Sequence, residues 1–244
     1  LNSREIITGY PDRSYRPESF ISRQEFVVLL IRAMNQQREA EVLQQGIPYF
    51  KDSDTWAKGY VELAHEMNLA QGDEPGVFAP LRQINREEAV SILVNCLGEE
   101  DESPATATGF NDDAEISAWA SPSISLAIQK GLLHGFPDNS FRPKSNLTRA
   151  QVAVMLEALL KYQGRQYQIS GTITQVNLPL RKVTVVVDER QESFELAANV
   201  MVWSQETQQP LTEIPLPANA YFDLNSDGKL TYILITNPNQ KISQ

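Results

Sequence analysis

Apolar side chains recur at helical spacing in three separate segments of the chain. Residues three or four positions apart share one face of an α-helix. The three apolar sets are Phe26, Leu29, Leu30 and Met34; Val90, Leu93, Val94 and Leu97; and Val152, Met155, Leu156 and Leu159. Ser22, Asn85 and Thr148 precede these sets, and each is followed at the third position by Glu or Gln, in the form of a capping box. The pattern predicts three helices that begin directly after these caps.

A loop rich in glycine and proline precedes each predicted helix. The loops occupy residues 9–17, 72–80 and 135–143, and glycine and proline favour turns there. We expect one aromatic residue in each loop to pack onto the core; these residues are Tyr15, Phe78 and Phe141. Two further helices are predicted to begin near Trp56 and Trp119, each after a Phe-x-Asp segment.

These landmarks define an internal repeat. Gly9, Gly72 and Gly135 follow one another at steps of 63 residues, and the arginines after the caps keep the same step. By register, Leu1 falls late in the first helix of its unit, so we expect the first unit to be truncated at its N-terminus. The repeat predicts three helix-loop-helix units, bounded at residues 1–40, 41–102 and 103–163.

The chain changes character after about residue 163. Residues 165–240 alternate apolar and polar side chains and are rich in β-branched residues, as is typical of short strands. Asp227-Gly228, between the last two alternating runs, is a hairpin turn signal. About five or six strands predict a small antiparallel barrel or sandwich. The whole chain is therefore predicted to be α+β, with a helical part followed by a small β domain.

Composition narrows the classes of function. The 244 residues carry 31 acidic and 21 basic side chains, a net charge of −10, which argues against nucleic acid as a partner because phosphate binding needs cationic contacts. No apolar run approaches the roughly 20 residues of a membrane span. A single cysteine excludes a disulfide framework and a cysteine-cluster zinc site. His65 and His134 are out of register with each other, which argues against a shared metal site, and we expect no cofactor.

The chain also lacks the common signatures of catalysis. We find no nucleophile elbow, phosphate loop or zinc motif. Residues 223–228 are similar to the opening of a calcium-binding loop, but the twelfth position is Leu234, where a carboxylate is needed. This segment is better interpreted as a hairpin tip. The sequence predicts a protein that is not an enzyme.

The repeat resembles the S-layer homology (SLH) family. The segments that carry the resemblance are Phe50-Lys-Asp52, Trp56-Ala57, Gly135-Phe-Pro-Asp-Asn-Ser-Phe-Arg-Pro143 and Leu147-Thr-Arg-Ala-Gln151. Over residues 1–162, the resemblance implies a pseudo-threefold all-α bundle of three SLH repeats with grooves between them. It further implies non-catalytic anchoring to a cell-wall or secondary cell-wall polysaccharide, often a pyruvylated one, at the bacterial cell surface. The middle repeat departs most from the family pattern, because Glu74-Pro75-Gly76 replaces Pro-Asp.

An arginine follows the cap of each of the three repeated helices, at Arg23, Arg86 and Arg149. Free backbone N–H groups at a helix start favour an anion, and a guanidinium beside them can hold a carboxylate at two points. A pyruvate ketal on a sugar presents such a carboxylate. We therefore expect these arginines to supply the cationic element of equivalent grooves. The alternative is that each arginine pairs with a carboxylate such as Asp12 or Asp138 and braces its loop.

Four further side chains belong to the expected glycan site. Asp12 and Asp138 can accept hydrogen bonds from sugar hydroxyl groups. Trp56 and Trp119 can offer an apolar face to a pyranose ring, although burial in the core is the favoured role of a large aromatic residue at a helix start.

Several alternatives stay open for the chain as a whole. The repeats could form a protein–protein assembly scaffold at the cell surface. The β domain could be an accessory region of a wall-active enzyme, or an oligonucleotide-binding barrel, which its slight acidity disfavours. In the leading interpretation the β domain is a spacer, an adaptor or an assembly surface for surface-layer partners.

Overall fold

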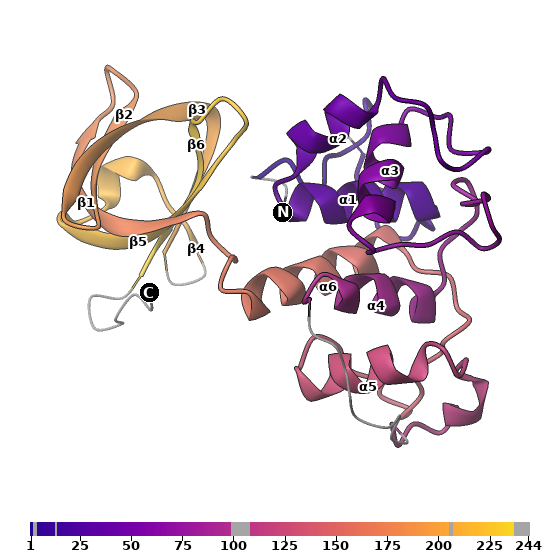
Figure 1. Cartoon of the computed structure of the whole chain (residues 1–244). Coiled ribbons are helices and arrows are strands. Elements are labelled where there is room, and N and C mark those ends of the chain that lie inside the picture. The colour runs from indigo at the N-terminus through magenta and orange to yellow at the C-terminus, as the bar shows by residue number, and fades with distance from the viewer. Residues whose placement is uncertain (2–3, 13, 99–107, 205–206, 237–244) are drawn as a thin grey trace. The chain divides into compact units, whose positions relative to one another are not determined.

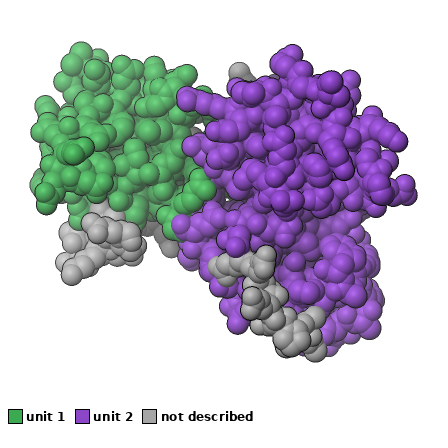
Figure 2. All heavy atoms as spheres, in the orientation of Figure 1, with its two compact units in different colours: residues 1–7, 164–244 green, residues 8–163 purple. Residues whose placement is uncertain are grey.

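The computed structural model describes residues 1, 4–12, 14–98, 108–204 and 207–236. The chain is α+β and divides into two compact units (Figure 2). One unit comprises residues 8–163 and holds the helices, and the other comprises residues 1–7 and 164–244 and holds the sheet. Residues 1–7, which the sequence assigns to the first repeat, thus cluster with the β unit. The predicted boundary between the second and third repeats, at residues 102 and 103, lies outside the described residues.

Among the residues that the structure describes, the helical unit contains six α-helices (Figure 1). They are α1 (Arg23–Ala33), α2 (Gln37–Leu43), α3 (Lys58–Glu66), α4 (Arg86–Asn95), α5 (Ser121–Gln129) and α6 (Arg149–Tyr162), with a short 3₁₀ turn at Asp113–Glu115. The starts of α1, α4 and α6 are confirmed, because Ser22, Asn85 and Thr148 each complete a capping box. Helix α2 is not predicted by the sequence. It begins without a side-chain cap and buries only Ala40.

The three repeats are joined by a closed ring of backbone hydrogen bonds. The N–H of Ile21 donates to the carbonyl of Leu147 at 3.0 Å, Leu147 donates to Ile84 at 3.1 Å, and Ile84 donates back to Ile21 at 3.1 Å. All three side chains are buried, and the residues lie 63 positions apart. Each repeat therefore holds the other two through equivalent atoms.

The loops before α1, α4 and α6 share an unusual backbone conformation. Arg16, Ala79 and Arg142 occupy equivalent positions and have φ values of 52°, 56° and 59°. Phe78 and Phe141 pack these loops into the core, as predicted, with no exposed surface. The prediction is wrong for Tyr15, which is 38% exposed. Its ring lies 5.2 Å from the guanidinium carbon of Arg149 instead of in the core.

In the described ranges of the β unit, six strands form one sheet. They are β1 (Ile169–Asn177), β2 (Lys182–Val187), β3 (Arg190–Ser204), β4 (Thr207–Gln208), β5 (Ala218–Leu224) and β6 (Leu230–Ile235), with a 3₁₀ turn at Leu211–Glu213. Their order is β2-β1-β5-β6-β3-β4, and β2 also pairs with β3, so five of the strands pair in a closed cycle. The buried core of this unit includes Ile173, Val183, Val185, Phe222 and Ile233.

The prediction of a purely antiparallel sheet is wrong at one pairing. Strands β3 and β6 are parallel, whereas the other pairings are antiparallel. The reason is that β5 pairs with β1 and not with β3, so that β6 returns alongside β3 in the same direction. The hairpin between β5 and β6 is confirmed, with Gly228 at a φ of 73° and the Asn225 side chain accepting from the N–H groups of Asp227 and Lys229.

None of the helices in the described part of the chain has the length and hydropathy needed to cross a bilayer.

Candidate functional site

The three arginines of the expected site are the first residues of α1, α4 and α6. Their relative exposures are 4% for Arg23, 8% for Arg86 and 8% for Arg149. The expectation of free N–H groups beside them is wrong. In each helix, the first two backbone N–H groups donate to carbonyls of a loop from another repeat, as Arg23 does to Arg82 at 2.9 Å and Gln24 does to Pro80 at 3.0 Å. Any attraction for an anion therefore comes from the guanidinium and not from the helix start.

Each guanidinium binds backbone carbonyls of that same neighbouring loop. Arg23 donates from Nε to Phe78 at 3.0 Å and from Nη2 to Gln71 at 2.9 Å. Arg149 repeats both bonds, and Arg86 repeats only the one from Nη2. Their bonds run from Arg149 Nε to Tyr15 at 3.1 Å, from Arg149 Nη2 to Thr8 at 2.9 Å and from Arg86 Nη2 to His134 at 2.8 Å. The arginines therefore brace the loops, and they do so through carbonyls and not through Asp12 or Asp138.

The guanidinium groups of Arg86 and Arg149 do not use all of their N–H donors. Among the described residues, neither Nη1 group donates a hydrogen bond, and the buried Nε of Arg86 has no partner. The guanidinium of Arg86 lies 5.0 Å from the ring centres of both Phe136 and Phe141. Burial lowers the pKa of Arg86, and the nearby cation Arg142 lowers it further. These two arginines therefore retain donors for a ligand.

Asp12 and Asp138 lie in equivalent turns and are engaged by their own loops. Asp138 accepts from the hydroxyl and N–H of Ser140 at 2.6 and 3.1 Å and from Arg142 Nη2 at 2.8 Å. These hydrogen bonds, that of the Ser140 hydroxyl first, lower the pKa of Asp138 to about 2. Asp12 has the same contacts from Ser14 and Arg16, which lower its pKa as well. Both carboxylates are exposed, so they can still meet solvent or a ligand.

The aspartates of the two Phe-x-Asp segments bind backbone N–H groups of the loops before α4 and α6. Asp52 accepts from the N–H groups of Phe78 and Ala79, both at 2.8 Å. Asp112 accepts from the N–H groups of Phe141 at 2.8 Å and Arg142 at 2.6 Å. One carboxylate thus accepts from two successive backbone N–H groups in both repeats, and the second of these belongs to the residue of positive φ, Ala79 or Arg142. These aspartates hold the loop backbone that the arginines also bind.

Trp56 and Trp119 lie on the surface. Their relative exposures are 60% and 58%, so the preferred interpretation of core packing is wrong. A polar residue one or two positions before each tryptophan forms a hydrogen bond with the first turn of a helix from another repeat. Thr55 donates to Gln24 Oε1 at 2.8 Å, and Ser117 donates from its hydroxyl to Glu87 Oε1 at 2.9 Å. These paired contacts hold the chain next to both indoles.

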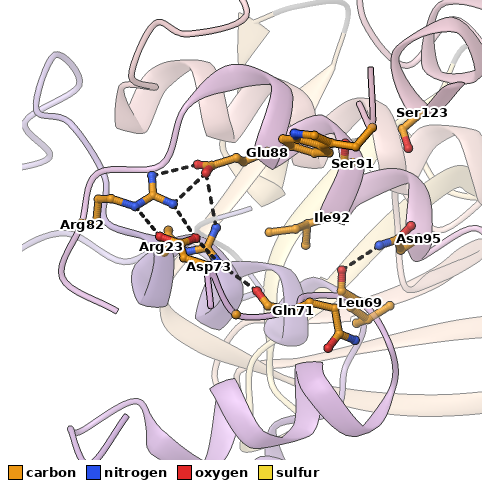
Figure 3. A pocket seen from close by; sticks show the side chains of 12 residues that line it. Arg23, Leu69, Gln71, Asp73, Arg82, Glu88, Ser91, Ile92, Asn95 and Ser123 are labelled. Carbon is orange, nitrogen blue, oxygen red and sulfur yellow. Dashed lines mark hydrogen bonds and ion pairs between the residues drawn. The ribbon is translucent and has the colours of Figure 1, made fainter. Parts of the chain in front are cut away.

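The structure brings Arg23 and Trp119 to one cleft of about 700 Å³. The cleft lies between α4 and the start of α5, with the loop after α3 on its other side (Figure 3). Its polar and aromatic lining includes Arg23, Gln71, Asp73, Arg82, Glu88, Ser91, Asn95, Trp119 and Ser123. We call this the middle cleft. All of its lining residues belong to the helical unit.

Two cations and two carboxylates meet in the middle cleft (Figure 3). Arg82 donates to both oxygens of Asp73 at 2.9 Å and to both oxygens of Glu88 at 3.1 and 2.7 Å. Burial lowers the pKa of Arg23, and Asp73 followed by Glu88 opposes that shift. Sequence reasoning missed Arg82, Asp73 and Glu88 as members of the site. The available signal is that Asp73 stands where the other loops carry Tyr10 and Phe136.

No group of three or more His, Cys, Asp or Glu side chains in the described ranges is arranged to hold a metal ion. His65 packs against aromatic rings, with its centre 4.3 Å from that of Tyr49.

The chain is similar to known proteins over its helical unit. The family described as "S-layer homology domain" matches residues 1–27, 49–90 and 109–153. Amylopullulanase of Thermoanaerobacterium thermosulfurigenes is 32% identical over 67% of this chain and 9% of its own length. The cellulosome-anchoring protein of Acetivibrio thermocellus is 27% identical over 64% of this chain and 35% of its own length. S-layer protein EA1 of Bacillus anthracis is 25% identical over 73% of this chain and 20% of its own length.

The chain thus spans only a small part of the curated relatives that it matches. The matched segments contain the repeated loops and the starts of α1, α4 and α6, where the arginines lie. Through these three repeats, the chain belongs to the S-layer homology domain family of extracytoplasmic cell-envelope proteins.

Proposed function

We propose that the chain anchors its parent protein to the cell wall by binding an acidic wall polysaccharide in grooves between the repeats. The observation that carries this proposal is that the guanidinium groups of Arg86 and Arg149 have N–H donors without a hydrogen-bond partner among the described residues. Each guanidinium is fixed by its loop, and Nη1 has no hydrogen-bond partner among the described residues. A fixed and permanently charged donor loses little freedom when a carboxylate binds.

The acidic group best suited to these sites is the carboxylate of a pyruvylated sugar. In such a sugar a compact anion projects from a pyranose ring, which offers C–H groups on its faces. Arg23 and Trp119 line the same cleft. Two steps of 63 residues lead from Arg23 to Arg149, and one step back leads from Trp119 to Trp56. In a cyclic arrangement of the three repeats, the counterpart of this pair is therefore Arg149 with Trp56. At the Arg149 site, the sugar ring would stack on the exposed indole of Trp56 while its carboxylate reaches the guanidinium of Arg149.

We also infer that the three repeats are related by an approximate threefold axis. The ring of hydrogen bonds among Ile21, Ile84 and Leu147 supports this arrangement. Similar grooves around one axis would each bind weakly, and a polymer that engages two of them would be held more tightly than by either alone. The function of this part of the chain is then recognition and not catalysis.

The names of relatives support a role in attachment. One relative is a cellulosome-anchoring protein and another is an S-layer protein. Others are named amylopullulanase, exoglucanase and endoglucanase, which favours a second candidate role as the attachment region of an enzyme. Incubation of the chain with purified wall glycan tests whether these residues have activity themselves, because any activity would release new reducing ends.

The proposal is tested by sedimentation with isolated cell walls before and after chemical removal of the secondary polymer. We expect the chain to sediment with intact walls and to remain in the supernatant after the polymer is removed. A methyl mannoside that carries a pyruvate ketal should compete for binding, and methyl mannoside without the ketal should compete far less. Equal sedimentation with stripped walls would contradict the proposal.

A further inference from the structure

The middle cleft differs in charge from the sites at Arg86 and Arg149. We propose that the middle cleft takes an uncharged saccharide, while the acidic sugars bind at Arg86 and Arg149. This inference rests on the proposed function, because it assigns a class of ligand to one of the proposed grooves.

Arg23 already faces protein carboxylates where the carboxylate of a ligand would lie. Its Nη1 is 3.8 Å from Glu88 Oε1, and its Nη2 is 3.6 Å from Asp73 Oδ1. Its Nε and Nη2 also donate to the carbonyls of Phe78 and Gln71. An acidic ligand at this guanidinium must therefore displace Glu88 or Asp73, or lie against both carboxylates.

Arg82 holds both carboxylates in place. It binds each of them through two oxygens, at 2.9 Å for Asp73 and at 2.7 to 3.1 Å for Glu88. The side chain of Glu88 is only 14% exposed, so its displacement would leave a largely buried carboxylate without its partner. Such a loss is costly, and a third carboxylate in the same cleft would also be repelled by the two already there. The four charges balance, and they leave no net positive charge in the cleft.

The other two repeats lack this arrangement. By the step of 63 residues, Asp73 corresponds to Tyr10 and Phe136, and Arg82 corresponds to two serines, Ser19 and Ser145. Within the described part of the chain, no Asp or Glu oxygen lies within 4.0 Å of the guanidinium nitrogens of Arg86 or Arg149. The difference between the sites thus lies in two positions of the middle repeat, 73 and 82, because the position of Glu88 carries Glu25 in the first repeat and Gln151 in the third.

The rest of the middle cleft suits a neutral sugar. Its volume of about 700 Å³ lies within the range of small-ligand sites, roughly 300–1,000 Å³. Gln71, Ser91, Asn95 and Ser123 offer uncharged hydrogen-bonding groups, and the indole of Trp119 is exposed beside them. Hydroxyl and acetamido groups can bind these side chains while one face of the sugar stacks on the indole. Specificity then arises because the cleft disfavours an anion as well as fitting a neutral ring.

The test is a titration of the whole ¹⁵N-labelled chain, followed by NMR. Di-N-acetylchitobiose is the neutral probe, and the methyl mannoside with a pyruvate ketal is the acidic probe. The reporters are the indole N–H signals of Trp56, Trp119 and Trp203 and the Nε–H signals of the arginines. We expect the neutral probe to shift the Trp119 signal and leave Trp203 in place. We expect the acidic probe to shift the signals of Arg86 and Arg149 and not that of Trp119.

A double variant, D73N/E88Q, reverses the preference of the middle cleft. It removes both carboxylates and leaves two arginines with a net positive charge, so binding of the acidic probe beside Trp119 should tighten by about tenfold or more. E88Q alone is the second variant, because Gln151 occupies the equivalent position in the third repeat and completes its capping box there. It should show a smaller gain of the same sign.

Three results would overturn the inference. The first is an acidic probe that shifts Trp119 of the unaltered chain as strongly as it shifts Arg149. The second is a neutral probe that leaves Trp119 unmoved up to its solubility limit, and the third is the absence of any gain in folded D73N/E88Q and E88Q. If the chain sediments with walls while one of these results is found, the inference fails and the proposed function stands. A chain that does not sediment with walls removes the proposed function itself.

Discussion

Arg149 at the start of α6 donates a hydrogen bond of 2.9 Å from Nη2 to the carbonyl oxygen of Thr8, 141 positions earlier in the chain. The last repeat is thereby joined to the loop of the first. Arg23 makes the equivalent bond to Gln71, and Arg86 makes it to His134. The residues proposed to bind the wall are therefore also residues that hold the repeats together. Any test of binding has to separate these two effects.

The exposure of Trp56 and Trp119 can be measured by fluorescence. In a W203F variant, only these two indoles emit. Because both are more than half exposed, emission should be red-shifted and acrylamide should quench it almost as well as it quenches free tryptophan. Blue-shifted emission with weak quenching in the folded variant would show that both indoles are buried, which would contradict the structure.

Removal of the Asp112 carboxylate should destabilise the third repeat. D112A leaves the N–H groups of Phe141 and Arg142 without their acceptor, at a cost of about 2–3 kcal/mol in the free energy of unfolding. Urea unfolding followed by circular dichroism measures the change. D54A is the matched control, because Asp54 is largely exposed and makes only a 3.7 Å pair with Lys58, so we expect a change below about 0.5 kcal/mol. Equal stability of both variants would refute the role of Asp112.

The pKa of Asp138 can be read directly by NMR titration of its carboxyl carbon. We expect a value of about 2, because Ser140 and Arg142 donate to the charged form. A lowered pKa in the folded state means that these bonds add stability above about pH 4, and that this contribution is lost as the pH falls toward 2. In an S140A/R142Q variant the pKa should return toward its ordinary value of 3.8. A pKa near 4 in the unaltered chain would mean that these bonds do not form.

The thiol of Cys96 should react slowly in the folded chain. Burial raises its pKa to about 12, so the thiolate is scarce until the pH approaches that value. At pH 8 the thiolate fraction is about a thousandfold lower than for an unperturbed thiol, and alkylation by iodoacetamide should slow to a similar degree. The same measurement in denaturant supplies the control rate. Fast alkylation of the native chain would show that the thiol is accessible.

Local signals predicted the repeated helices well. Ser22, Asn85 and Thr148 cap α1, α4 and α6 because a capping box needs only residues three positions apart. The hairpin at Asp227-Gly228 is likewise encoded within a few residues. Helix α2 has no such cap and buries only one alanine, so neither a capping box nor an apolar periodicity predicts it.

Features that depend on distant parts of the chain were harder to predict. The parallel pairing of β3 with β6 depends on where β5 pairs, and nothing in the sequence of either strand indicates it. The N–H groups at the start of α1 are free in an isolated helix, and here a loop more than 50 residues away uses them. The charges of Arg82 and Glu88 have a clear role only once the fold brings Arg23 from another repeat to within 3.8 Å of Glu88.

Wall sedimentation of the R86Q/R149Q variant tests the central claim most directly. The charge-matched control is R38Q/R190Q, since both of its arginines are exposed. Folding of both variants is first checked by circular dichroism and thermal melting, with single substitutions used if the double variant is unstable. We predict that R86Q/R149Q loses at least about tenfold in affinity for intact walls, while R38Q/R190Q binds like the unaltered chain. A folded R86Q/R149Q variant that sediments as well as the control would contradict the account.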